Sequence, residues 1–323
     1  MRTLSGIFVF ALVALPASTA DGPLPWAYAI SPAPPPGAAA PAQPAPDTSL
    51  KHLDGSTAEF TRAQISNRFG PADWFPGDHP SMPDLVAHGK PPEVWACGLC
   101  HYPNGKGRPE NAPVAGLPVE YFIQQMHDFR DGLRKSAEPR KTNTNLMATF
   151  AKNMSEDEIK AAAIYFGSMK WTPWIKVEET NMAPKTRLAG GMFLTLEGNE
   201  KEPLGKRILE TPVNAEATEV LRNPHSGFIA YVPPGSVKRG EALVTKGAGR
   251  TTQCSLCHGA DLQGLGPVPG IAGRSPSYLA RQLYDMREGT RNGTWTQLMK
   301  PVVARLSDQD ILDIVAYTAS RMP

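Results

Sequence analysis

The sequence predicts a mainly α-helical chain: two small all-α domains in tandem, with a small irregular insertion that contains short strands between them. Three observations support this fold class. Residues 97–134 align without a gap on residues 254–291 as an internal repeat. Apolar residues recur at helical spacing within each copy. In the segment that lies between the two copies, apolar and polar residues alternate along the chain instead. We therefore expect domains at 51–170 and 236–323 and an insertion at 171–235.

The N-terminal end has the features of an export signal. Arg2 precedes an apolar stretch at 7–15, and the small residues Ser18 and Ala20 follow it. This pattern is typical of a secretory signal peptide over residues 1–20, with cleavage after about Ala20. The apolar run is too short to span a bilayer comfortably, although an uncleaved anchor is the alternative. We expect a periplasmic protein whose membrane contact is peripheral at most.

Residues 21–50 are expected to form an extended tether, because the Pro/Ala-rich run within them cannot build a core. The insertion is too long for a simple linker, and its alternating pattern predicts strands at 187–196, 206–211 and 227–232. The 323-residue chain has a formal net charge of +2, which gives no support for binding to nucleic acid.

Each domain is expected to contain helices at matched places. Apolar residues mark one face of the first matched pair: Phe122, Met126, Phe129 and Leu133, and then Leu279, Leu283 and Met286. Ser155 and Ser307 are expected to cap the closing helices, because Glu158 and Asp310 follow three residues later, close to a capping box. A further short helix is expected after a cap at Ser236.

All four cysteines of the chain lie in two copies of the pattern Cys-x-x-Cys-His: Cys97, Cys100 and His101, and Cys254, Cys257 and His258. Two thiols at this spacing can add to the vinyl groups of a haem, and the adjacent histidine then lies under the iron. The alternatives are a disulfide, a zinc site and purely structural cysteines. A disulfide gives no role to the repeated histidine, and neighbouring Cys100 and His101 are poorly placed to bind one tetrahedral ion together. We therefore predict two covalently attached haem c groups.

Met147 and Met299 are the candidate sixth ligands of the two irons. They lie 46 and 41 residues after the two histidines, and each precedes the serine that caps its closing helix by eight residues. Most methionines are expected in the core, and Met154 and Met286 have no methionine at the matched position. A thioether ligand favours Fe(II) and raises the reduction potential. The predicted iron ligands are thus His101 with Met147 and His258 with Met299.

Other residues are expected to support the haems. The second nitrogen of each histidine needs an acceptor, for which the backbone carbonyls of Pro113 and Gly270 are candidates. Six repeated residues are equally candidates for binding haem propionates and for ordinary helix-surface or core positions: Arg130, Arg134, Arg287, Arg291, Tyr121 and Tyr278. Four histidines without counterparts are expected at ordinary surface or loop positions: His79, His88, His127 and His225.

The sequence resembles a dihaem c-type cytochrome made of two class I cytochrome c domains. The resemblance rests on "CGLCH" with Met147, on "CSLCH" with Met299, and on the closing helices "SEDEIKAAAIYF" and "SDQDILDIVAYT". It covers about residues 85–170 and 236–323. The resemblance implies a periplasmic electron carrier with haems in adjacent domains. The Pro-rich extension and the insertion depart from the compact family pattern, and they are candidate docking surfaces for a partner.

The first hypothesis for function is an electron shuttle, with redox proteins as partners. It would carry electrons between a dehydrogenase or quinol-oxidising complex and a terminal acceptor. Two methionine-ligated irons leave no open position for substrate, so we expect no catalytic residues and no enzyme activity. One alternative is a haem-bearing subunit of a periplasmic dehydrogenase. Another is a dihaem peroxidase, which would need one iron that lacks or loses its sixth ligand.

Overall fold

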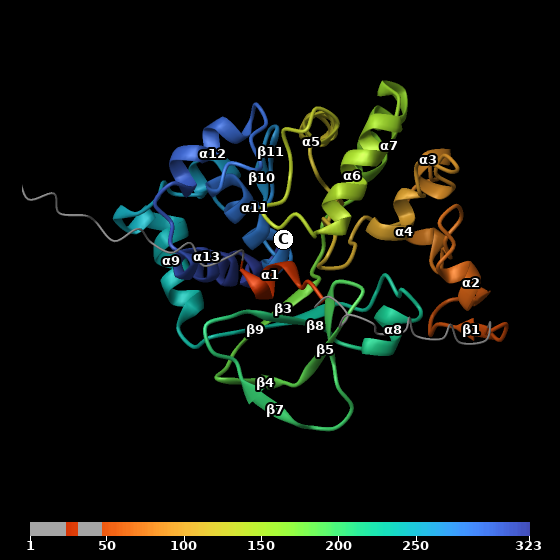
Figure 1. Cartoon of the computed structure of the whole chain (residues 1–323), viewed down its shortest axis with the longest axis horizontal. Helices are drawn as coiled ribbons and strands as arrows, with labels where there is room; N and C mark the ends of the chain where they lie inside the picture. Colours follow the sequence, from red (N-terminus) through yellow and green to blue (C-terminus); the bar gives the residue numbers. More distant parts are fainter. Residues whose placement is uncertain (1–23, 32–46) are drawn as a thin grey trace, which may run out of the picture.

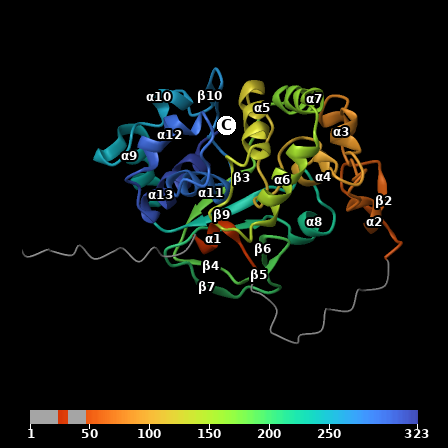
Figure 2. The same ribbon diagram turned by 45° about the horizontal axis from the view of Figure 1, so that its top comes forward.

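The computed structural model describes residues 24–31 and 47–323, which fold into two helical domains side by side above a small β-containing unit (Figure 1). Figure 2 shows the strands of the insertion beneath both helical domains. The predicted signal peptide with its cleavage site after Ala20 lies outside the described residues, as does the part of the predicted tether at 32–46. No helix in the described ranges combines the length and apolarity needed to cross a membrane.

The first helical domain is built around three helices that enclose its core. Its elements are β1 (Leu50–His52), β2 (Glu59–Thr61), α2 (Arg62–Ile65), η1 (Pro76–Asp78), α3 (Asp84–Ala87), α4 (Cys97–His101), α5 (Val119–Arg130), α6 (Thr142–Asn153) and α7 (Glu156–Gly167). Helix α5 packs on both α6 and α7. The predicted capping box of α7 is confirmed, because Ser155 Oγ accepts from Glu158 N at 3.2 Å and Ser155 N donates to Glu158 Oε2 at 2.7 Å.

The second helical domain repeats this arrangement around its closing helix. Its elements are α9 (Ser236–Lys246), η2 (Gly247–Gly249), α10 (Ser255–His258), β10 (Gly264–Leu265), β11 (Val268–Pro269), α11 (Pro276–Arg287), α12 (Thr296–Val303) and α13 (Asp308–Ser320). The predicted box of Ser307 with Asp310 is confirmed. The cap predicted at Ser236 is wrong. Gly235 is the N-cap, and Ser236 Oγ instead accepts from Arg239 Nη2 at 3.1 Å.

Helices α9 and α13 cross at very close range, and a glycine makes this possible. A Cβ atom at Gly240 would overlap the carbonyl of Asp313 and crowd the side chain of Tyr317. The backbones can meet only because Gly240 has no side chain. Helix α13 is buried over most of its length and joins α9 and α11 in one hydrophobic cluster.

The insertion forms a small β-containing unit, as predicted. Its elements are β3 (Ile175–Glu179), β4 (Met182–Pro184), β5 (Thr186–Ala189), β6 (Met192–Thr195), β7 (Lys201–Pro203), β8 (Leu209–Pro212), α8 (Ala215–Glu219) and β9 (Phe228–Val232). Strand β9 pairs in parallel with β3 and antiparallel with β8. The strand predicted at 187–196 is instead the hairpin β5–β6, because Gly190 and Gly191 both take positive φ angles and turn the chain.

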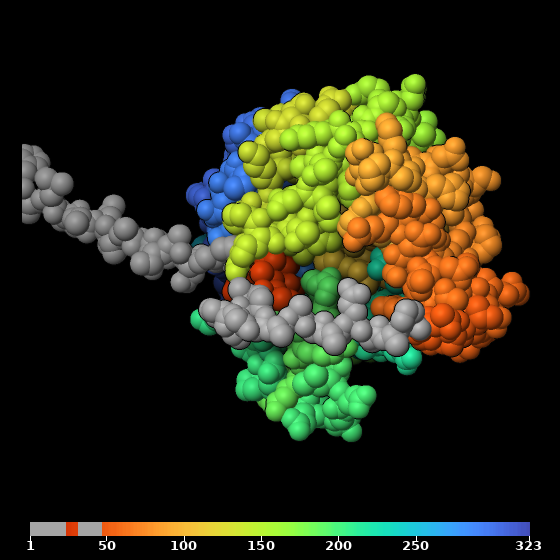
Figure 3. Space-filling model, turned by 45° about the vertical axis from the view of Figure 1, so that its right-hand side comes forward, coloured from red at the N-terminus to blue at the C-terminus, as the bar shows by residue number. Residues whose placement is uncertain are grey.

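A short helix, α1 (Pro25–Tyr28), packs into the core of the second domain. Trp26 is 7% exposed and Tyr28 is 1% exposed. Tyr28 Oη donates to Asp285 Oδ1 at 2.5 Å, and Arg281 donates to the carbonyl of Ala27 at 2.6 Å. The predicted tether over 21–50 is therefore wrong for residues 24–30, because most of their side chains are buried. Figure 3 shows this segment in red, directly below the yellow-green residues of the first domain.

The two helical domains contact each other directly, and the insertion does not separate them. Arg134 and Arg291, at matched positions of the repeat, form an antiparallel backbone bridge. On either side of it, Lys135 N donates to the carbonyl of Thr290 at 2.9 Å, and Asn292 N donates to the carbonyl of Leu133 at 2.6 Å. The domains therefore join along an interface that pairs equivalent parts of the repeat.

Candidate haem cavities

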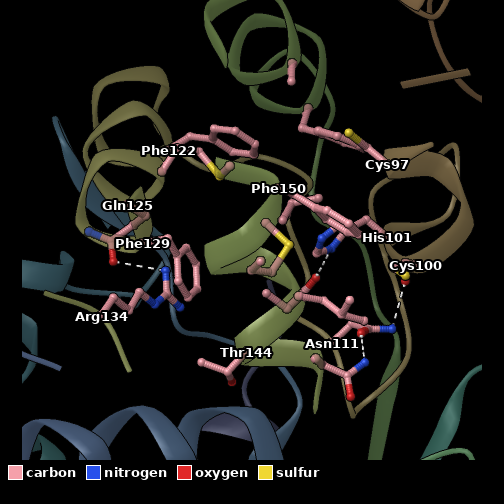
Figure 4. A pocket seen from close by; sticks show the side chains of 18 of the residues that line it. Cys97, Cys100, His101, Asn111, Phe122, Gln125, Phe129, Arg134, Thr144 and Phe150 are labelled. Carbon is pink, nitrogen blue, oxygen red and sulfur yellow. Dashed lines mark hydrogen bonds between the residues drawn. The ribbon is translucent and has the colours of Figure 1, made fainter. Parts of the chain in front are cut away.

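The first domain contains a cavity lined by its Cys-x-x-Cys-His segment (Figure 4). Helix α4 supplies Cys97, Cys100 and His101, and α6 brings Met147 to the same cavity. Its apolar walls include Phe122, Met126, Phe129, Phe150 and Phe166. The cavity holds about 1280 Å³ of space with its open mouth included.

The loop after α4 folds back over the helix and orients its histidine. The amides of Val114 and Ala115 both donate to the carbonyl of Gly105, at 2.8 and 3.0 Å. This fold brings the carbonyl of Ala112 to 2.8 Å from His101 Nδ1. A carbonyl can only accept, so Nδ1 carries the proton and Nε2 keeps its lone pair for a metal. Burial lowers the pKa of His101, which favours the same neutral form.

The second domain builds an equivalent cavity of about 1450 Å³, again with the mouth included. Helix α10 supplies Cys257 and His258, Cys254 directly precedes it, and α12 contributes Met299. His258 Nδ1 lies 2.8 Å from the carbonyl of Pro269 and donates to it. Burial lowers the pKa of His258 as well. Each cavity therefore offers two thiols, one neutral imidazole and more than one thioether: Met126, Met147 and Met154 in the first, and Met286 and Met299 in the second.

The acceptors predicted for the two histidines, Pro113 and Gly270, are wrong by one residue. The carbonyls in use are those of Ala112 and Pro269, which occupy matched positions of the repeat. The hydrogen bonds of each loop set this register. In the second copy the amides of Ile271 and Ala272 both donate to the carbonyl of Leu262, as their counterparts do to Gly105.

None of the four cysteines, all of which lie within the described residues, forms a disulfide. Burial raises the pKa of Cys97 to about 12 and that of Cys254 to about 11, so an unreacted thiol stays protonated near neutral pH. Within residues 24–31 and 47–323, no group of three or more His, Cys, Asp and Glu side chains is placed to hold a metal ion. The donor sets of the two cavities fit a haem held by two thioether bonds and two axial side chains.

Six side chains at the domain contact form what we call the interface cluster: Tyr121, Gln125, Arg134, Tyr278, Gln282 and Arg291. Arg134 donates to Gln125 Oε1 of its own domain at 3.0 Å and to Gln282 Oε1 of the other domain at 2.9 Å. Arg291 repeats this pattern, with Gln282 at 3.0 Å and Gln125 at 2.7 Å. The cluster thus has an approximate two-fold arrangement, in which each arginine links both domains.

Four members of the interface cluster were propionate candidates, and all four line at least one cavity: Arg134, Arg291, Tyr121 and Tyr278. The other two candidates point elsewhere. Arg130 pairs with Glu156 at 2.5 Å, and Arg287 pairs with Asp308 at 2.8 Å. Sequence reasoning did not select Gln125 and Gln282, although their identity at matched positions of the repeat was the available signal.

The two described cavities are not lined by any of the four histidines expected at surface or loop positions. His79 lies near Asp73, His127 pairs with Glu156, and His225 stacks on Phe75 with ring centroids 3.9 Å apart. His88 is exposed after the end of α3. Their surface and loop positions agree with the sequence prediction.

The chain is similar to known c-type cytochromes. Residues 237–321 match the family model described as cytochrome c. Cytochrome c-554(548) of Halomonas halodenitrificans is 45% identical over 69 residues, which cover 21% of this chain and 83% of that protein. Cytochrome c4 of Pseudomonas aeruginosa is 26% identical, with 68% of this chain and 81% of the relative covered. A thiosulfate dehydrogenase electron acceptor of Thiomonas intermedia is 25% identical, with 72% and 81% covered.

The two helical domains, each with a Cys-x-x-Cys-His cavity, define a c-type cytochrome. The chain belongs to the cytochrome c family. It is a dihaem protein with two class I domains and two covalently attached haem c groups. Its function is electron transfer rather than enzymatic catalysis.

Proposed function

We propose that each cavity holds its haem through the donor set that lines it. In the first cavity Cys97 and Cys100 form the thioether bonds, and His101 and Met147 bind the iron. In the second cavity the corresponding residues are Cys254, Cys257, His258 and Met299. Support comes from the lining of the cavities and from the two Nδ1–H···O bonds, which leave each Nε2 available for iron. The bound haem supplies reversible one-electron chemistry at its iron.

The protein acts as an electron shuttle between partner proteins in the periplasm. The observation that carries this proposal is the shared wall of the two cavities. Leu117 and the four uncharged members of the interface cluster line both of them. An electron that enters at one domain therefore has a short route to the other within a single molecule. The signal-like N-terminus supports export to the periplasm.

The electron donor is a periplasmic dehydrogenase or a quinol-oxidising complex, and the electrons pass from this protein to a terminal acceptor. One relative is named as the electron acceptor of thiosulfate dehydrogenase, which supports an enzyme that oxidises a sulfur compound as the donor. Co-purification from the periplasm distinguishes a free carrier from a haem-bearing subunit that stays attached to its dehydrogenase.

Paired methionine variants test the ligand assignment. Met147→Ala and Met299→Ala should each convert one haem to a high-spin form that binds carbon monoxide, while the other haem stays low-spin. Met154→Ala and Met286→Ala are matched controls, because these methionines line the same two cavities. Both controls should keep two low-spin signals in the EPR spectrum of the ferric protein.

Two outcomes would contradict the proposal. A Met147→Ala or Met299→Ala variant that stays fully low-spin would show that another side chain binds that iron. A high-spin signal from one haem of the unmodified protein would instead indicate an open iron position, and peroxidase activity would then replace electron shuttling as the proposed function.

A further inference from the structure

Arg274, just before α11, is buried in the domain contact with 3% of its surface exposed. Three of its nitrogens donate to backbone carbonyls. Nε donates to Gly270 at 2.7 Å within its own domain. Nη1 and Nη2 donate across the contact to Pro113 at 3.0 Å and to Ala115 at 3.1 Å. The guanidinium therefore holds one loop of each domain, and these acceptors are peptide groups rather than carboxylates.

The carbonyls of Pro113 and Gly270 are equivalent in the repeat. Each belongs to the residue directly after the one whose carbonyl accepts from a cavity histidine, namely Ala112 in the first domain and Pro269 in the second. One guanidinium is therefore bonded to both histidine-orienting loops, a single peptide unit away from each histidine acceptor. The direct link between the two loops runs through this side chain.

This link occurs once and breaks the symmetry of the repeat. The residue that matches Arg274 in the first copy is Leu117, which cannot form such hydrogen bonds. Trp171, four residues after the end of α7, fixes Arg274 from the other side. Its ring lies 4.8 Å from the guanidinium carbon, and its Nε1 donates to the carbonyl of Ala272 at 3.1 Å. The arginine is thus held by both domains.

We propose that Arg274 is a positioning residue that couples the two cavity histidines, because it holds the loops that carry both of their acceptor carbonyls. The proposal rests on His101 and His258 being the axial ligands. The acceptor of an axial imidazole sets the basicity of the ring and, through it, the reduction potential of the iron. A change at Arg274 therefore alters the reduction potentials of both haems, although the side chain bonds to neither histidine.

The positive charge of Arg274 acts in the same direction at both sites. Burial lowers its pKa to about 10, so the guanidinium is still charged at neutral pH. This buried cation lies next to the second cavity and next to the histidine-orienting loop of the first domain. It therefore disfavours the more positive ferric state of each haem. Removal of the charge should therefore lower both reduction potentials, whereas a change in loop geometry alone would alter the histidine hydrogen bonds without that common direction.

Two variants separate charge from position. Arg274→Leu introduces the side chain found at the matched position, and Arg274→Lys keeps the charge but loses the planar fork. Arg130→Leu is the control, because it removes one positive charge from an exposed site away from the contact. Redox titration reports both potentials. NMR of protein labelled with ¹⁵N-histidine, in the ferrous state, reports solvent exchange and chemical shift of each Nδ1–H.

We expect Arg274→Leu to lower both potentials and to speed exchange of both Nδ1–H protons. Arg274→Lys should still change both Nδ1–H signals, and Arg130→Leu should leave them unchanged. Unchanged signals in both Arg274 variants, or changes confined to His258, would overturn the coupling. If His101 or His258 of the unmodified protein lacks the large haem-induced ring shifts of an axial ligand, the ligand assignment fails, and the coupling fails with it.

Discussion

Replacement of Trp26 by alanine tests whether the N-terminal segment is part of the folded core. Trp26 is 7% exposed and packs in the hydrophobic cluster of the second domain with residues of α11 and α13. Truncation of a buried aromatic side chain to alanine costs about 3–5 kcal/mol. A side chain in an extended tether would cost about 0.5 kcal/mol or less, as at other surface sites. The two descriptions therefore differ by several kcal/mol.

Tyr28→Phe probes the same contact through a single hydrogen bond. The hydroxyl donates to Asp285 Oδ1 at 2.5 Å, and Asp285 otherwise accepts from the amide of Ala137 at 2.8 Å. Loss of a hydrogen bond to a charged group costs about 1.5–3 kcal/mol. Tyr28→Phe should therefore lower the free energy of unfolding by less than Trp26→Ala does, but by a measurable amount. Ser31→Ala is the control, because Ser31 is exposed at the end of the same segment.

The assay is equilibrium unfolding in urea, followed by the haem absorbance, since the covalent bonds keep the haems on the unfolded chain. We expect Trp26→Ala to lower the free energy of unfolding by about 3–5 kcal/mol, which shifts the transition to a lower urea concentration. Ser31→Ala should leave the transition unchanged. A free energy of unfolding for Trp26→Ala within about 0.5 kcal/mol of the unmodified protein would refute the packing of α1.

Two further substitutions have defined outcomes. Lys141 is buried and donates to the carbonyl of Tyr28 at 3.3 Å, and burial lowers its pKa from 10.5 to about 7. Between these values the unfolded chain binds a proton that the folded chain lacks, so this group makes stability rise with pH by up to about 1.4 kcal/mol per unit. Lys141→Met should remove that part of the slope in unfolding curves from pH 7 to 10, and an identical slope would disprove it. Gly240→Ala should destabilise the second domain by about 3 kcal/mol or more, because α9 and α13 cannot meet with a Cβ there. Both this variant and the control Gly77→Ala are measured by urea unfolding, and Gly77→Ala should have little effect because nothing lies near the added atom.

Several features of this protein follow from local sequence. The capping boxes at Ser155 and Ser307 involve residues three apart, so the chain needs no distant partner to form them. The Cys-x-x-Cys-His segments are equally local, and each places its thiols and its histidine on or next to one short helix. Comparison of the two copies of the repeat selected Met147 and Met299, because they occupy matched positions. Both line the expected cavities.

Helix α1 could not be predicted from sequence patterns. A four-residue helix is far too short to be stable alone, since isolated helices need about 12–15 residues to be even marginal in water. Its conformation depends on burial against α11, more than 240 residues away in the chain. The proline-rich composition that follows it predicted an extended segment, and only packing reverses this for residues 24–30.

The amino-acid sequence by itself determined the chemistry of the two cavities, because spacing, periodicity and repetition are properties of neighbouring or matched residues. Only the tertiary structure decided which groups meet across the domain contact. Arg134 reaches Gln282, and Arg274 reaches Pro113, over separations of 148 and 161 residues. The sequence shows which hydrogen-bond donors a side chain carries. Which distant acceptor that side chain meets depends on how the two domains pack. For this reason the cysteines, histidines and methionines that line the two cavities could be predicted, and the arginine that links their two loops could not.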